Sequence, residues 1–118
     1  MIAPFTTKAR RARRILGALS LGVLCVFVVP PSFAAPSPAR QEQLRHMVDQ
    51  DCGSCHGLTR QGGLGSPLRA ETLVEIGDEA LTATILDGRP GTPMPAWRGL
   101  LSEDDALWIV RHLKGEGP

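Results

Sequence analysis

Residues 52–56 read Cys-Gly-Ser-Cys-His, and their types and spacing point to chemistry more directly than any other segment of this 118-residue chain. Two thiols at this spacing can bond to the two vinyl groups of one haem, and the imidazole that follows can ligate the haem iron. A Cys-x-x-Cys pair also occurs in thiol redox centres and in structural zinc sites. The surrounding sequence therefore has to distinguish three kinds of site.

The surroundings of the motif favour haem. A thiol redox centre is expected after a strand in a βαβ pattern, whereas the sequence here predicts a helix before the motif and a glycine-rich loop after it. A zinc site needs two further ligands. Apart from Cys25, which we place in a cleaved leader, the chain offers only His46 and His112 for that role. We therefore interpret the motif as the attachment site of one covalently bound haem c.

A candidate for the sixth iron ligand lies in residues 92–97, which read Thr-Pro-Met-Pro-Ala-Trp. The thioether of Met94 is a soft, neutral ligand that favours reduced iron, and the prolines on both sides would stiffen its loop. Met47 is a competitor, but it falls on the apolar face of a predicted helix and is interpreted as core. The pattern favours Met94, with His46, His112 or an open sixth position as the alternatives.

These groups must be positioned by short helices and loops. The spacing of Leu44, Met47 and Val48 predicts a helix from about Ala39 to the cysteine motif. Residues 57–67 are rich in glycine and predict a loop that wraps the proximal side of the haem. Apolar residues between 73 and 86 predict two short helices that break near Gly77-Asp78. We expect Asp78 to cap the second of them and Gly88 to end it.

The last helix has the clearest sequence signals. Ser102 is expected at the N-cap with Asp105 three residues on, and Gly115 should end the helix. An apolar stripe that should pack on the first helix consists of Ala106, Ile109, Val110 and Leu113. The three acids at 103–105 suit the positive start of a helix and are interpreted as solvated. Trp108 lies off the stripe, so we expect it to be partly exposed.

The N-terminus has the three parts of an export signal. Five basic residues precede residue 15, residues 15–29 are apolar, and residues 32–34 place small side chains where a signal peptidase cleaves. The apolar stretch is shorter than the about 20 residues that span a membrane. We expect residues 1–34 to be removed on export to the periplasm, with an uncleaved anchor as the alternative. Residues 35–38 would form a linker and residues 39–118 one domain.

Cleavage would reverse the sign of the net charge. The five basic residues leave with the leader, so eight basic and 12 acidic residues remain, which gives −4 in place of the +1 of the whole chain. Trp97 and Trp108 would be the remaining aromatic residues. A domain this small builds only a small core from side chains, and a covalently held porphyrin would supply its centre.

The order of cysteine motif, glycine-rich loop, methionine and terminal helix resembles class I c-type cytochromes. That fold is all-α: helices near the two ends cross, and short helices and Gly/Pro-rich loops enclose one covalent haem. More narrowly, residues 50–57, 62–65 and 87–97 are similar to cytochrome c-55X, a family of small periplasmic cytochromes of denitrifying bacteria. Ser66 stands where that family leads us to expect a second proline.

The resemblance implies a set of site residues. Thioether bonds would come from Cys52 and Cys55, and axial bonds from His56 and Met94. The carbonyl of Pro67 would accept the hydrogen bond of the proximal imidazole and make it a better donor. We further place in the haem environment Leu68, Trp97, Arg89 and Arg98.

An iron with an imidazole in one axial position and a thioether in the other has no open site for a substrate and is suited to passing single electrons. The sequence offers no catalytic triad or phosphate-binding loop, so we expect an electron-transfer protein and not an enzyme. The resemblance implies that it receives electrons from an upstream donor and reduces a terminal reductase, the haem-d-containing nitrite reductase. The alternative is an accessory role in maturation or haem-d assembly of that enzyme. We expect no nucleic-acid partner, no stable membrane insertion after cleavage, and a monomer.

The expected docking with redox partners is brief and steered by charge. Four arginines lie in the loops predicted around the haem, where they can pair with haem propionates, form a basic docking rim or stay solvated: Arg60, Arg69, Arg89 and Arg98. The indole of Trp97 can donate to a propionate or pack on the porphyrin edge.

Overall fold

Helices make up the regular secondary structure of the computed structural model, which describes residues 32–116 and contains no strand among them. The described residues belong to one compact unit. In chain order the elements are α1 (Pro38–Met47), the π-helical turn η1 (Val48–Cys52), α2 (Gly53–His56), α3 (Ala70–Leu73), α4 (Asp78–Asp87) and α5 (Glu103–Lys114). The predicted all-α class is confirmed.

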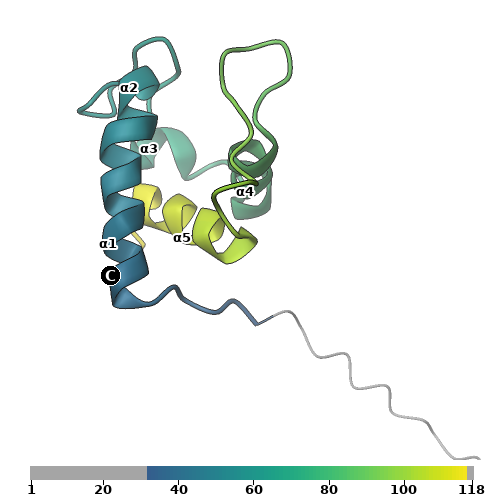
Figure 1. Cartoon of the computed structure of the whole chain (residues 1–118). Helices are drawn as coiled ribbons and strands as arrows, with labels where there is room; N and C mark the ends of the chain where they lie inside the picture. The colour runs from purple at the N-terminus through teal and green to yellow at the C-terminus, as the bar shows by residue number, and fades with distance from the viewer. Residues whose placement is uncertain (1–31, 117–118) are drawn as a thin grey trace, which may run out of the picture. The chain divides into compact units, whose positions relative to one another are not determined.

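One continuous helical segment leads from Pro38 to the cysteine motif (Figure 1). The hydroxyl of Ser37 accepts a hydrogen bond from the backbone N–H of Arg40, and Pro38 occupies the first turn, where its missing N–H costs nothing. The segment runs through α1, η1 and α2 and ends at Gly57, whose φ of 85° suits glycine. The predicted first helix is confirmed, with its start one residue before Ala39.

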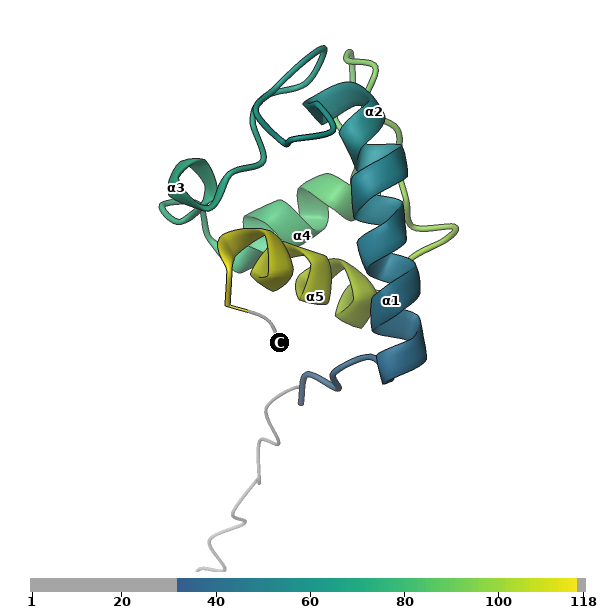
Figure 2. The same ribbon diagram turned by 90° about the vertical axis from the view of Figure 1, so that its left-hand side faces the viewer.

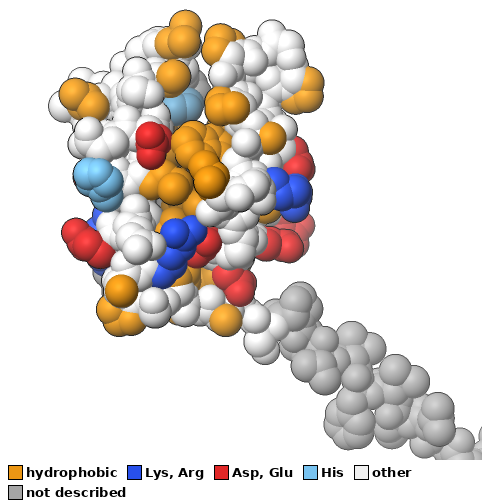
Figure 3. Space-filling view, in the orientation of Figure 1, with side chains coloured by type: hydrophobic (Ala, Val, Ile, Leu, Met, Phe, Trp, Pro, Cys, Tyr) orange, Lys and Arg blue, Asp and Glu red, His pale blue; other side chains and the backbone are white. Residues whose placement is uncertain are grey.

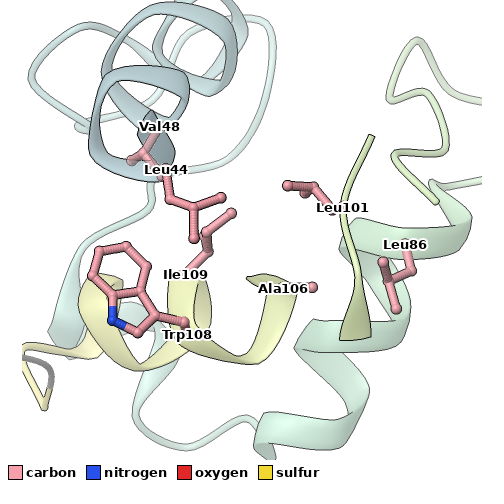
Figure 4. Packing of buried hydrophobic residues seen from close by; sticks show 7 residues of the cluster. All are labelled: Leu44, Val48, Leu86, Leu101, Ala106, Trp108 and Ile109. Carbon is pink, nitrogen blue, oxygen red and sulfur yellow. The ribbon is translucent and has the colours of Figure 1, made fainter. Parts of the chain in front are cut away.

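The crossing of α1 with α5 forms the core (Figure 2). Leu44 and Val48 on the first segment are fully buried, and Ile109 on α5 is 1% exposed. Figure 4 shows Leu44 directed toward Ile109. Ala106 and Val110 are also buried, so the predicted apolar stripe of α5 faces the interior. The expected contact between the two terminal helices is confirmed.

Trp108 corrects the sequence analysis, because it is only 3% exposed and not partly exposed as predicted. The indole stacks on His112 with ring centroids 5.0 Å apart and an interplanar angle of 7°. The guanidinium of Arg45 on α1 lies 5.4 Å from the indole centroid. Because α1 crosses beside the apolar stripe, it covers a wider face of α5 than the stripe alone. The indole Nε1 is buried without a hydrogen-bond partner among the described residues.

Asp105 corrects the prediction that all three first-turn acids of α5 are solvated. The predicted capping box is present: Ser102 Oγ accepts from the Asp105 N–H, and the Asp105 carboxylate accepts from the Ser102 N–H. The same carboxylate is 2.8 Å from Arg40 Nη2, and Arg40 also donates to the carbonyl of Leu100. The hydrogen bond from Arg40 lowers the pKa of Asp105. The pair joins the start of α1 to the start of α5.

The predicted break between the two short middle helices is confirmed, but the cap is not Asp78. Gly77 is the N-cap residue, and Asp78 is the first residue of α4. Its carboxylate instead lies 2.7 Å from Lys114 Nζ and 3.6 Å from Arg111 Nε. The hydrogen bond from Lys114 lowers the pKa of Asp78. Sequence reasoning could not anticipate these partners, since they come from the last turn of α5.

The predicted leader, residues 1–34, lies outside the described residues except for its last three. Phe33 is partly buried against the core, and the Arg111 guanidinium lies 4.6 Å from its ring centroid. Cleavage after residue 34 would remove this contact. Within residues 32–116, no helix is long and apolar enough to cross a bilayer.

Candidate functional site

The cysteine motif occupies the last turns of the long N-terminal segment. Cys52 ends η1, while Cys55 and His56 belong to α2. A π-helical turn such as η1 is rare and often marks a functional position. Both cysteines are half-buried and free, and Cys52 packs against the core cluster. Burial raises the pKa of the Cys52 thiol, and the neighbouring charge of Asp51 raises it further, so this thiol stays protonated at neutral pH.

The imidazole of His56 is held by the loop that follows it. Its Nδ1 lies 2.6 Å from the carbonyl oxygen of Ser66. A carbonyl can only accept, so Nδ1 carries the proton and Nε2 keeps a free lone pair for a metal. This contact corrects the inference from family resemblance, which assigned the accepting carbonyl to Pro67, one residue further on. The carbonyl of Pro67 instead accepts from the hydroxyl of Thr72.

The loop at 57–68 wraps His56 through its backbone. The N–H of Gly65 donates to the carbonyl of Cys55 at 2.8 Å, and the N–H of Gly62 donates to that of His56 at 2.9 Å. A Cβ atom at position 65 would lie 2.6 Å from His56 Cε1. Only a residue without a side chain allows the backbone to pass this close to the ring. The predicted proximal loop is thus found against the predicted proximal ligand.

Met94 lies on a second loop, which is anchored to the end of α4. The backbone N–H groups of Trp97 and Arg98 both donate to the carbonyl of Leu86, each at 3.1 Å. At the other side of the loop, the N–H of Arg89 donates to the carbonyl of Met94 at 3.2 Å. The φ of Gly88 is 68°, and a Cβ there would lie 2.8 Å from the Met94 carbonyl oxygen, so glycine is required where α4 ends.

The two loops lie at the same end of the described unit. Figures 1 and 2 place α2 and the loop after α4 at this end, and Figure 3 shows hydrophobic side chains gathered between them. Met94, Trp97 and Leu68 are each half-buried. Trp97 packs against the core cluster. This apolar surface between α2 and the loop after α4 suits a flat, largely apolar group.

Two of the arginines predicted around the haem have partners within the chain. Arg98 forms an ion pair with Asp87 at 2.6 Å, and Arg69 forms one with Glu71. Arg89 is exposed, and Arg60 is half-buried. Sequence spacing could suggest the Arg69 pair, since Glu71 is two residues away. The Arg98 pair depends on the return of the loop to α4 and has no local signal.

The chemistry of this donor set fits haem c. Two free thiols are available for attachment, the orientation of His56 leaves Nε2 free to bind iron, and the glycine-rich backbone leaves room beside the ring. The soft thioether of Met94 lies on the facing loop. An all-α fold with crossed terminal helices around such a site defines the class I c-type cytochromes. The chain is a member of this class.

Comparison with known proteins narrows the class. A family model described as cytochrome C oxidase, cbb3-type, subunit III matches residues 39–113. Cytochrome c55X of Paracoccus denitrificans is 53% identical over 94 residues, which cover 79% of this chain and 91% of the relative. The solved structure of the c-type cytochrome NirC is 55% identical with a TM-score of 0.67, and the match covers 70% of this chain and 100% of that one. The chain belongs to the cytochrome c55X family.

A further relative is a much longer protein. Dihydro-heme d1 dehydrogenase of Pseudomonas aeruginosa is 38% identical over 100 residues, which cover 85% of this chain but 18% of that protein. Family membership establishes covalently bound haem c, single-electron transfer as the function, and redox proteins in general as partners. The expected cofactor and fold are confirmed.

Proposed function

We propose that Cys52 and Cys55 form the thioether bonds, and that His56 Nε2 and Met94 Sδ are the two axial ligands. The observation that carries the proximal assignment is the 2.6 Å contact between His56 Nδ1 and the Ser66 carbonyl, which directs the free lone pair to Nε2. Met94 is supported by its half-buried place on an anchored loop at the same end of the unit. When bound, haem c supplies an iron that changes oxidation state by one electron.

Replacement of the methionine tests the distal assignment. Met94→Ala should abolish the absorption band that a thioether gives on ferric haem iron. Met47→Ala is the matched control, because Met47 is also half-buried but packs against the core cluster on α1. Loss of the band in the Met47 variant, with the band kept in Met94→Ala, would transfer the assignment to Met47.

The proposed role is that of a periplasmic electron carrier that reduces a terminal reductase, the haem-d-containing nitrite reductase of denitrification. Residues 1–34 would be the export signal, residues 35–38 a linker and residues 39–118 the haem domain, active as a monomer. Support comes from membership in the c55X family and from the relative in Paracoccus denitrificans. With both axial positions filled by His56 and Met94, no position remains for a substrate, which supports a carrier that is not an enzyme.

Stopped-flow mixing tests this role. The reduced haem protein is mixed with oxidised nitrite reductase, and its visible bands are followed after Met94 ligation has been checked. Reoxidation fast enough to sustain turnover of the reductase is the expected result. Negligible transfer from a protein with an intact Met-ligated spectrum would overturn the partnership.

A second candidate is a role in maturation or haem-d assembly of the same nitrite reductase. It is favoured by the similarity to dihydro-heme d1 dehydrogenase, whose solved structure in complex with DHE is 34% identical to this chain with a TM-score of 0.55. Nitrite reductase isolated from a strain that lacks this chain distinguishes the two roles. A full haem-d content supports the carrier, whereas a reductase without haem d supports maturation.

A further inference from the structure

Helices α4 and α5 lie side by side (Figures 1 and 2), and a groove of about 360 Å³ runs between them, enough for one long side chain. None of the residues that line it belongs to the cysteine motif or is a proposed axial ligand. The groove is therefore distinct from the haem-attachment site. The lining residues that matter below are Glu79, Thr82 and Ala83 of α4, Arg98, and Glu103 and Leu107 of α5.

Thr82 brings an unsatisfied hydroxyl to this groove. The residue is 6% exposed, and its Oγ1 is buried without a hydrogen-bond partner among the described residues. Thr84 on the same helix shows the usual solution, because its hydroxyl donates to the carbonyl of Ala80 at 2.8 Å. A buried hydroxyl that lacks a partner is destabilising, so a hydrogen-bond donor that enters the groove would meet an acceptor with nothing else to bind.

Two carboxylates at the groove are also without partners. Glu79 and Glu103 are exposed, and neither forms an ion pair or a side-chain hydrogen bond within residues 32–116. Asp78, next to Glu79, is by contrast held by Lys114. Each of the two glutamates lies in the first turn of its helix, where the helix dipole favours negative charge. The dipole does not require, however, that both border the groove that contains the unsatisfied hydroxyl.

The basic residues nearby do not neutralise these carboxylates. Arg98 lines the groove, but its guanidinium lies 2.6 Å from the carboxylate of Asp87. The basic side chains in the last turn of α5 are engaged with Asp78. Asp104, also in the first turn of α5, has no ion pair in the described part of the chain and adds negative charge close by. The groove therefore presents net negative charge, which a cationic occupant would complement.

We propose that this groove binds a lysine side chain of a protein partner. An ammonium group has three N–H donors and no acceptor. It matches the three acceptors at the groove, which are the carboxylates of Glu79 and Glu103 and the hydroxyl of Thr82. The aliphatic stem of the lysine would lie along Ala83 and Leu107. The inference does not depend on which protein accepts the electron, since no residue of the haem site takes part.

An NMR titration of the reduced haem protein tests the groove, because low-spin ferrous haem is diamagnetic. The isotopically labelled protein is titrated with a tetralysine peptide, and the backbone amide signals of residues 79–83 and 103–107 are followed. Saturable shifts confined to these two segments are expected, and they should weaken as salt screens the carboxylates. Tetraarginine, titrated in parallel, should bind less tightly, because a planar guanidinium does not match three separate acceptors.

Two variants separate the groove from the net charge of the protein. Glu79→Gln/Glu103→Gln should bind tetralysine about fivefold more weakly. Glu75→Gln/Glu116→Gln is the matched control, because it removes the same charge from exposed positions that do not line the groove, and it should bind like wild type.

Thr82→Val tests the hydroxyl. Tetralysine should bind this variant about threefold more weakly. Stability should not fall, since valine has a similar shape and removes a hydroxyl that the free protein leaves without a partner. Weaker binding by a variant that is at least as stable as wild type would not arise from a merely structural role of Thr82.

Other results would overturn the proposal. Equal loss of affinity in the two charge variants, or shifts that spread over the surface without saturation, would show attraction by net charge alone. Tighter binding of tetraarginine would assign the groove to a guanidinium group and not to lysine. Unchanged affinity in Thr82→Val would remove the hydroxyl from the site and with it the match of three acceptors to three donors.

Discussion

The helix crossing and the two loops at 57–68 and 88–97 are held together in different ways. At the crossing of α1 and α5, side chains of the chain itself fill the interior, and Leu44, Val48 and Ile109 are at most 1% exposed. In the loops, backbone hydrogen bonds and glycines fix the path, while Met94, Trp97 and Leu68 remain half-exposed. The crossing is therefore held by side-chain packing, whereas the paths of the loops are fixed by backbone hydrogen bonds.

Ile109→Ala should break the crossing and give the largest effect. The side chain is 1% exposed, and its removal leaves a cavity between α1 and α5, so the free energy of unfolding should fall by about 3 kcal/mol. Denaturant titration of the haem protein measures this change. Leu100→Ala, at a site that is 67% exposed, should change stability by less than about 0.5 kcal/mol. A visible spectrum altered in Ile109→Ala before unfolding would show that the crossing and the loops are not independent.

Gly65→Ala should disturb the loops without entering the crossing. The new methyl group would lie 2.6 Å from His56 Cε1, and the ring cannot move freely because Ser66 holds its Nδ1. We expect a loss of about 2 kcal/mol in stability together with weakened imidazole ligation in the visible spectrum. Gly99→Ala is the control, since a Cβ there meets nothing within 4 Å. An unperturbed spectrum in Gly65→Ala would contradict the close passage of the loop.

Asp105→Asn should weaken the crossing through its charge. Replacement of the carboxylate that pairs with Arg40 should cost about 1.5 kcal/mol at neutral pH. The folded-state pKa of Asp105 is lowered, chiefly by the hydrogen bond from Arg40, so its contribution is complete above the unfolded pKa of about 3.9 and is lost as pH falls through the folded pKa. The stability curves of wild type and variant should therefore converge in acid. Glu103→Gln, at an exposed position in the same turn, leaves the Arg40–Asp105 pair in place and is the control.

The difference between local signals and contacts of distant segments explains which features the sequence predicts. Helix boundaries at Ser102, Gly88 and Gly115 follow from local chemistry, and the structure confirms them. The apolar stripe of α5 follows from periodicity. Trp108 and Asp105 are more buried than the sequence predicts, because their burial depends on where α1 crosses α5 and the periodicity of α5 alone contains no information about its neighbour. Contacts between distant segments, such as Arg40 with Asp105, leave no local signal.

At the site, the sequence predicts the residue types that fit haem c, but it does not predict which carbonyl orients His56. The motif at 52–56 identifies the cofactor because two thiols at this spacing, followed by a histidine, are what covalent attachment of haem c requires. The carbonyl that orients His56 belongs to a backbone group, which every residue possesses, so residue type cannot reveal it. The structure assigns it to Ser66, the residue that departs from the expected proline. A carbonyl performs the same task on either residue, which explains how the position tolerates serine.

His112 offers the smallest and most specific test of the crossing. Its ring stacks on Trp108, and its pKa lies below the usual value because burial disfavours the charged form. The positive charges of Arg60 and Arg45 lower the pKa further, while Asp49 opposes them. Glu71 and Arg69 line the same groove as His112, and their charges oppose each other in an ion pair.

The sign of the pH effect follows from linkage. As pH falls below about 6.5, the unfolded chain takes up a proton on His112 before the folded chain does, so the free energy of unfolding should decrease. The decrease should stop once pH has passed the folded pKa. Denaturant titrations between pH 5 and 7.5, compared between wild type and variants, measure this slope. His112→Gln should remove that part of the slope, whereas His46→Gln, at an exposed position on α1, should retain it. Equal slopes in wild type and His112→Gln would show that the histidine is not held neutral by the crossing.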